Sequence, residues 1–106
     1  MIRYGSDAPF LQQLSDGKLL LTWSPYLDDN YVVLSAVSES GDLRGPWTHV
    51  LTPLYDQNGG HAMFFRDLNA RLCMCLHAPE SDMLERAHIF EMEEDGVLVV
   101  KGEISA

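Results

Sequence analysis

The sequence has 106 residues, with seven Lys and Arg against sixteen Asp and Glu, which gives a formal charge of −9. This length predicts a single unit, and the 46% hydrophobic content excludes disordered and fibrous proteins. The basic residues are scattered singly among acids, so we expect no nucleic acid as a partner. No apolar run approaches the about 20 residues of a membrane-spanning helix, so we expect no membrane partner. The first residues lack the pattern of a signal peptide, which predicts a cytoplasmic location.

Strand signals recur at short intervals, and helix signals are nearly absent. We expect strands at residues 9–14, 18–24, 31–38, 47–51, 62–66, 71–77, 87–93 and 97–101. The S-D-G at 15–17 and E-D-G at 94–96 are typical of hairpin turns, because glycine takes positive φ readily. Residues 27–30 and 79–85 are interpreted as longer loops. The pattern predicts an all-β fold of two four-stranded antiparallel sheets, at residues 7–52 and 60–104, with a linker over 52–60.

The two sheets look like copies of one unit. A shift of 53 residues lays 7–24 over 60–77 without a gap, so that Asp16 meets Asn69 and Lys18 meets Arg71. A four-stranded antiparallel unit that repeats every 40–50 residues or so is typical of a β-propeller blade. Residues 19–21 and 72–76 are apolar on both faces, so their strands need cover on each side. Neighbouring blades or a two-sheet sandwich would both provide it, and the pattern leaves these alternatives open.

Two cysteines stand two positions apart in one of the expected strands. Cys73 and Cys75 would then share a face, with Cα atoms about 6.6 Å apart and parallel side chains. That geometry is poor for a disulfide and predicts two thiols that fill the core. His77 continues the same face, but three ligands from one strand span about 13 Å. Because zinc bonds are about 2.0–2.3 Å long, we expect no zinc site here.

Short motifs follow one another along nearly the whole chain. They are D-A-P-F-L at 7–11, D-G-K-L-L at 16–20, W-S at 23–24, G-P-W at 45–47, G-G-H-A-M at 59–63, F-R at 65–66, L-H-A-P at 76–79 and E-R at 85–86. In order and spacing these motifs resemble those of the last two blades of glycoside hydrolase family 43. Three departures stand out: Ala8 and Ala62 replace glycines of the family, and Asn69-Ala70 replaces a D-G turn.

The resemblance implies a great deal about function. Members of this family are five-bladed propellers that act on xylose- and arabinose-containing glycans with inversion, using a general base, a pKa-modulating Asp and a general acid. The first two carboxylates belong to the early blades, and no carboxylate here matches the base position. Asp7 falls at the general-acid position, although Asp is one methylene shorter than Glu. Outside such a site it would be an ordinary solvated carboxylate.

The resemblance also implies roles for four other residues. His61 would lie near the propeller axis, where a calcium ion or a water cluster can sit, and calcium prefers oxygen ligands. His77 would line the floor of the cleft or end its strand. Trp23 would stack on a sugar or pack between blades. Arg86 would point to the centre, where it could orient a carboxylate, or would pair with an acid at the surface.

Two functions of different classes remain open from the sequence. The first is a family 43 glycoside hydrolase, of the xylosidase or arabinofuranosidase kind, represented here by an incomplete part that is inactive alone. The second is a non-catalytic carbohydrate-binding or structural module. Two blades cannot close a ring and would expose apolar outer faces. We therefore expect either further N-terminal blades or a homo-oligomer of two, three or four chains.

Overall fold

The structure is a computed structural model that describes residues 6–105, and it is all-β over that range. Its strands are β1 (Ser6–Gln13), β2 (Leu19–Leu27), β3 (Asn30–Tyr31), β4 (Val33–Ser38), β5 (Trp47–Tyr55), β6 (Gly60–Arg66), β7 (Leu72–Ala78), β8 (Arg86–Glu93) and β9 (Val99–Glu103). Over residues 6–105 the chain has no helix long and apolar enough to cross a membrane.

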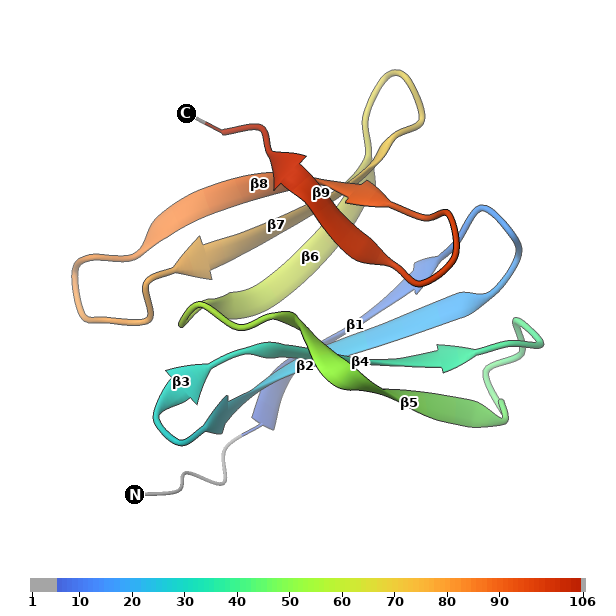
Figure 1. Cartoon of the computed structure of the whole chain (residues 1–106), viewed down its shortest axis with the longest axis horizontal. Coiled ribbons are helices and arrows are strands. Elements are labelled where there is room, and N and C mark those ends of the chain that lie inside the picture. Colours follow the sequence, from blue (N-terminus) through green and yellow to red (C-terminus); the bar gives the residue numbers. More distant parts are fainter. Residues whose placement is uncertain (1–5, 106) are drawn as a thin grey trace.

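The strands form two antiparallel sheets, one from each half of the chain (Figure 1). The first sheet has the order β1-β2-β4-β5, with the short β3 paired to β2, and the second has the order β6-β7-β8-β9. The predicted all-β fold of two four-stranded blades is thus confirmed. The inner strand β6 lies against β1 and β2, whereas β5 and β9 meet farther out. The two inner strands therefore lie side by side, and the sheets spread from them.

Two connections differ from the sequence-based expectation. The expected longer loop at 27–30 is wrong, because Tyr26 pairs with Tyr31 and Leu27 with Asn30 across a two-residue turn. Both turn residues, at positions 28 and 29, have positive φ, of 51° and 65°. Aspartate tolerates this conformation, which the tight hairpin turn requires. The expected linker at 52–60 is also shorter, because β5 continues to Tyr55.

The inner hairpins of the two sheets share an irregular start. The register of β1 on β2 shifts between Asp7 and Phe10, and that of β6 on β7 shifts between Gly60 and Met63. Each shift is a β-bulge, and each contains a residue with left-handed backbone: Ala8 at φ 56° and His61 at φ 57°. These positions correspond under the 53-residue shift, so the sequence repeat is also a repeat of backbone geometry.

The hairpin turns repeat in the same way. The N–H of Leu14 donates to the carbonyl of Lys18 over 2.9 Å, and the N–H of Asp67 donates to that of Arg71 over 3.0 Å. At the matching turn positions, Gly17 has a φ of 91° and Ala70 a φ of 62°. The expected D-G turn therefore persists in conformation although alanine has replaced its glycine.

The core lies between the facing sides of the two sheets. In the second sheet Phe64, Met74 and Phe90 are paired across β6, β7 and β8 and are all buried. Opposite them, the ring of Phe10 lies 5.9 Å from that of Phe64, and Leu20 is 1% exposed. Burying side chains of this size stabilises the fold by about 2 kcal/mol each, so this contact holds the sheets together.

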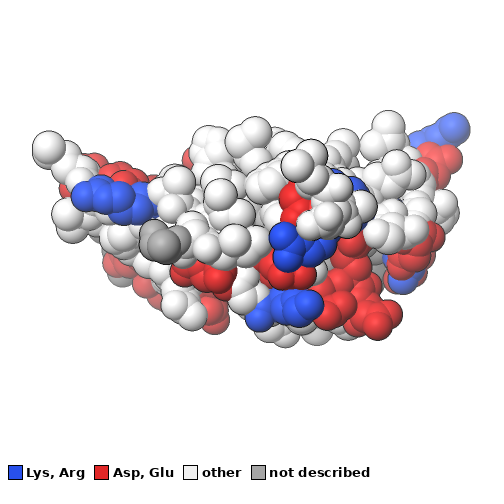
Figure 2. Space-filling view, turned by 90° about the horizontal axis from the view of Figure 1, so that it is seen from above, with Lys and Arg blue, Asp and Glu red and all other residues white. Residues whose placement is uncertain are grey.

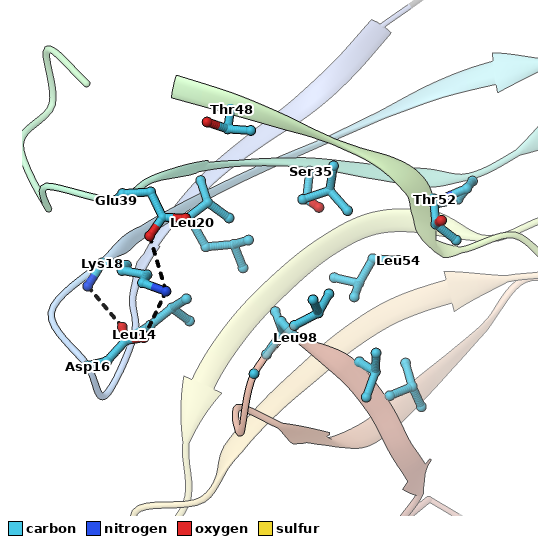
Figure 3. A pocket seen from close by; sticks show the side chains of 17 residues that line it. Leu14, Asp16, Lys18, Leu20, Ser35, Glu39, Thr48, Thr52, Leu54 and Leu98 are labelled. Carbon is cyan, nitrogen blue, oxygen red and sulfur yellow. Dashed lines mark hydrogen bonds and ion pairs between the residues drawn. The ribbon is translucent and has the colours of Figure 1, made fainter. Parts of the chain in front are cut away.

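The sheets diverge away from the inner strands and leave a half-open groove of about 390 Å³. Its walls are mainly aliphatic, and Leu14, Leu20, Leu54 and Leu98 point into it (Figure 3). At one end Lys18 bridges Asp16 and Glu39, with N–O distances of 3.4 and 3.2 Å. Because this ammonium is already paired with two acids, the groove offers apolar surface rather than an open charge.

Charge is unevenly distributed over the surface. Figure 2 shows acidic side chains gathered along the lower edge of that view, with basic side chains among them, while most of the upper part is uncharged. Arg66 and Glu94 form an ion pair of 2.9 Å, and Glu94 also accepts hydrogen bonds from the N–H and hydroxyl of Ser15. These contacts join a turn of the second sheet to the first turn of the first sheet.

Candidate functional site

The candidate site lies where the inner strands begin, at one end of both sheets. β1 contributes Asp7, β3 contributes Tyr31, β6 contributes His61, and β7 contributes His77. The fifth member, Glu80, follows β7 in the next loop. The structure thus brings together three of the residues that the sequence predicts for the site, namely Asp7, His61 and His77.

Tyr31 holds the candidate acid. Its hydroxyl donates a 2.8 Å hydrogen bond to Oδ1 of Asp7, and its side chain is buried while Asp7 is exposed. The Tyr31 N–H donates to Oδ1 of Asn58, and its carbonyl accepts from the N–H of Gly59. Burial, followed by the neighbouring Asp7 carboxylate, raises the pKa of the Tyr31 phenol well above its usual range. The phenol therefore remains a hydrogen-bond donor at neutral pH.

A second carboxylate ties the loop after β7 to the same cluster. Nε2 of His77 lies 2.8 Å from Oε1 of Glu80, and the hydroxyl of Tyr26 donates to Oε2. The backbone N–H of Glu80 donates to the carbonyl of Asn58 over 2.8 Å. The His77 ring stacks on Tyr31 with centroids 5.5 Å apart. The orientation of Tyr31, and with it that of Asp7, thus depends on residues of both sheets.

His61 is positioned beside the cluster by a hydrogen bond of its backbone. Its N–H donates 2.9 Å to Oγ of Ser24, and its exposed ring lies 6.3 Å from the His77 ring. Among residues 6–105, no three His, Cys, Asp or Glu side chains are placed to hold one metal ion. Calcium binds six to eight oxygen ligands, and the axial calcium or water site that the resemblance implies for His61 stays a prediction.

Trp23 and Arg86 lie apart from this cluster. The Trp23 indole meets the His49 ring edge-on at 5.6 Å, on the face of β2 opposite Ser24. Arg86 is exposed, and its Nη1 donates to the carbonyl of Glu85 over 2.9 Å. The structure therefore places Trp23 on an outer sheet face and the Arg86 guanidinium against the backbone carbonyl of Glu85.

The two cysteines are free thiols with different environments. Cys73 is buried, and this burial raises the pKa of its thiol, whereas Cys75 is half-buried. Because the thiolate is the reactive form, Cys73 has no feature of a nucleophile.

Sequence reasoning missed the residues that hold the site together. Tyr31, Asn58 and Glu80 belong to no motif of the resemblance, and their roles follow from contacts between distant segments. The three-residue spacing of His77 and Glu80 across a proline was the one local signal, because a turn brings such residues within reach.

Three solved structures share this fold. An endo-arabinase from Bacteroides thetaiotaomicron VPI-5482 matches 86% of this chain at 41% identity, with a TM-score of 0.77. An endo-1,4-beta-xylanase from the same organism matches 92% at 21% identity, with a TM-score of 0.72. A thermostable family-43 glycoside hydrolase matches 92% at 24% identity, with a TM-score of 0.71. The last two matches, below 25% identity, show the fold alone.

The matches cover only part of each of these proteins. The chain spans 32%, 38% and 35% of their respective lengths, which is about a third in each case. No protein-family model matches the chain, and no curated protein matches it. The resemblance to part of a family 43 glycoside hydrolase, expected from the motifs, is confirmed by the solved structures.

Proposed function

We propose that this chain, whose fold is that of part of a family 43 glycoside hydrolase, supplies the acid side of a site that cleaves arabinose- or xylose-containing glycans. Asp7 is the general acid of the proposal, and it would protonate the glycosidic oxygen as the bond breaks. Tyr31, His77 and Glu80 would hold its carboxyl in place. The base and the modulating carboxylate would come from further blades, so the chain alone would not hydrolyse glycans.

One observation carries this proposal. The carboxylate at the acid position of the motif is exposed, and it is oriented by a buried tyrosine that contacts both sheets. An inverting mechanism also requires a base about 6.5–9.5 Å from the acid, with room for a water molecule. Glu80 already accepts hydrogen bonds from His77 and Tyr26, which makes it a holding residue rather than a base.

A second candidate is a carbohydrate-binding module without catalysis. The rings of Tyr26, Tyr31 and His77 follow one another with centroid distances of 4.8 and 5.5 Å. Tyr31 itself is buried, so the half-buried rings of Tyr26 and His77 are the surfaces that would suit a sugar, which has apolar faces and hydroxyl edges. The shorter Asp7 in place of Glu also favours binding over cleavage.

Measurements of turnover and binding test both candidates, because each predicts that this chain alone binds a glycan without cleaving it. Release of 4-nitrophenol from the aryl α-L-arabinofuranoside and the aryl β-D-xyloside should stay at the buffer rate. Turnover that disappears in Asp7→Asn would contradict the incompleteness of the site.

Binding is measured by NMR titration with arabino- and xylo-oligosaccharides. We expect shifts at Asp7, His61 and His77, and none with cello-oligosaccharides. Asp7→Asn should weaken binding, whereas Asp95→Asn, which changes a distant exposed turn, should not. The absence of binding to every oligosaccharide would contradict both candidates.

A further inference from the structure

Each sheet has a second face that is turned away from the core. On the first sheet Leu11 pairs with Leu21, and Trp23 pairs with Leu34, so these four apolar side chains share its outer face. Leu11 is 48% exposed, and the other three are half-buried. This set is the outer face of the first sheet.

The second sheet has an apolar outer face of its own. Met63, Cys75 and Ile89 are paired across β6, β7 and β8, and Phe65 stands next to them on the same side. Met63 is 55% exposed and Phe65 is 42% exposed. This set is the outer face of the second sheet. Apolar patches of this kind on both outer faces are unusual for an isolated soluble monomer.

The 53-residue repeat relates these outer faces to the packed core. Phe10 and Thr22, on the inner face of the first sheet, correspond to Met63 and Cys75, on the outer face of the second. In the opposite sense, Phe64 and Met74 on the inner face of the second sheet correspond to Leu11 and Leu21 on the outer face of the first. The strand register agrees, because the bulge and the hairpin turn occur at matching positions in both sheets.

The packing inside the chain is therefore a template for packing between chains. Phe10 of the first sheet lies against Phe64 of the second, with ring centroids 5.9 Å apart. If the next copy stacks on the second sheet as the second sheet stacks on the first, Met63 takes the place of Phe10 and Leu11 of the next copy takes the place of Phe64. Met63 of one copy then lies against Leu11 of the next. Both members of this new pair are large, apolar and about half exposed in the single chain.

We propose that the outer face of the second sheet binds the outer face of the first sheet of a second copy of this chain. The contact is head-to-tail and continues the stacking that already joins the two sheets within one chain. It rests on packing and repeat geometry and uses no residue of the proposed glycan site. It concerns the 106-residue chain by itself, whereas the further blades of the proposed function would cover the same two outer faces. A head-to-tail contact forms a ring when its rotation closes.

Closure limits the size of the assembly. Propellers have about four to eight blades, and each copy contributes two, so a ring contains two, three or four copies. Since β1 and β6 are the inner strands, Asp7 and His61 of every copy would gather around the axis of the ring. A five-bladed ring cannot form from whole copies.

The test is the mass in solution, measured by light scattering over micromolar concentrations. We expect two, three or four times the 11.9 kDa of one chain. Leu11→Glu and Met63→Glu each place a charge in the proposed contact, and each should reduce the mass to that of one chain. Leu68→Glu changes a fully exposed residue of the turn after β6 and should leave the mass unchanged. A wild-type protein that remains at 11.9 kDa overturns the proposal.

Mixing the two variants tests the polarity of the contact. Leu11→Glu retains an intact second-sheet face, and Met63→Glu retains an intact first-sheet face. Their equimolar mixture should therefore form a pair of twice the chain mass that grows no further. Circular dichroism shows whether each variant keeps its β structure, and the mixture is made from folded variants. A concentrated mixture with no species heavier than either variant alone overturns the proposal.

Discussion

The ring of Tyr31 stacks on the imidazole of His77, with centroids 5.5 Å apart and planes 25° apart. Tyr31 belongs to the first sheet and His77 to the second, so the stack crosses the boundary between them. The same tyrosine donates a hydrogen bond to Asp7, and the same histidine contacts Glu80. The candidate site is therefore assembled only when the two sheets are docked.

Tyr31→Phe should keep the stack and lose the hydroxyl. We expect the free energy of unfolding at neutral pH to fall by about 1 kcal/mol, as for one hydrogen bond, and oligosaccharide binding to weaken because Asp7 is no longer held. The raised pKa of the phenol makes a stability contribution that is present below about pH 10 and is lost as pH rises through the folded-state value. Denaturant unfolding between neutral and alkaline pH should show less alkaline loss in Tyr31→Phe than in the wild type. Equal loss in both proteins would contradict this role.

Gly60→Ala should disrupt the site because the added methyl group would collide with two residues that support it. A Cβ at this position would come within 2.7 Å of both Ser24 Oγ and the Tyr31 ring, so one of them has to move. We expect a loss of about 1–3 kcal/mol in the free energy of unfolding, as for an overpacked core. Gly102→Ala is the matched control, because its Cβ would meet nothing within 4 Å. Equal effects of the two substitutions on chemical denaturation would refute this explanation.

The matching turns predict effects of opposite sign. Ala70 has a φ of 62°, a left-handed conformation that costs an alanine about 1 kcal/mol, so Ala70→Gly should stabilise the protein by up to about that amount. Gly17 has a φ of 91° and open space at its Cβ, so Gly17→Ala should destabilise it by a similar amount through backbone strain alone. Thermal unfolding of both variants checks the pair. A change of the unfolding temperature in the same direction in both variants would show that the two turns are not equivalent.

Glu94 should make stability depend on pH. Its hydrogen bond from Arg66, together with those from Ser15, lowers the pKa of its carboxyl. A lowered folded-state pKa gives stability that is present above the unfolded value of about 4.3 and is lost as pH falls through the folded-state value. Glu94→Gln should therefore cost about 2 kcal/mol at neutral pH, and much less in acid.

Unfolding free energies measured from neutral to acidic pH check this prediction. The neighbouring Glu93, which is exposed, provides the control, and Glu93→Gln should change little at any pH. If Glu94→Gln lost stability in acid as steeply as the wild type, the negative charge of Glu94 would not be what makes its contacts with Arg66 and Ser15 stabilising.

The strands could be predicted from the sequence because their signals are local. Short apolar segments, glycine turns and the 53-residue repeat are visible without a structure, and the fold agrees with all three. The two-residue turn at 28 and 29 could not be predicted in the same way. Its aspartates adopt positive φ because β2 and β3 pair on either side of them, and nothing in the letters L-D-D-N requires that pairing.

The site could be predicted only where a motif covers it. Asp7, His61 and His77 were identified through short motifs, and the structure places them at the same end of the sheets. Tyr31 was missed because its function comes from two contacts with distant parts of the chain, Asp7 and His77. For Trp23 the resemblance implied either stacking on a sugar or packing between blades. Its indole lies beside His49 on an outer sheet face, and the choice between these two roles stays a prediction.

The two thiols of β7 differ in accessibility, so their alkylation rates report two different properties of the molecule. Cys75 is half-buried on the outer face of the second sheet, so its rate of alkylation reports whether a second copy covers that face. Cys73 is buried, and its raised pKa leaves little thiolate, so alkylation there must wait for a local opening of the sheet. Alkylation rates followed by mass spectrometry would thus report assembly at Cys75 and local opening of the sheet at Cys73. Both measurements use native cysteines and need no engineered probe.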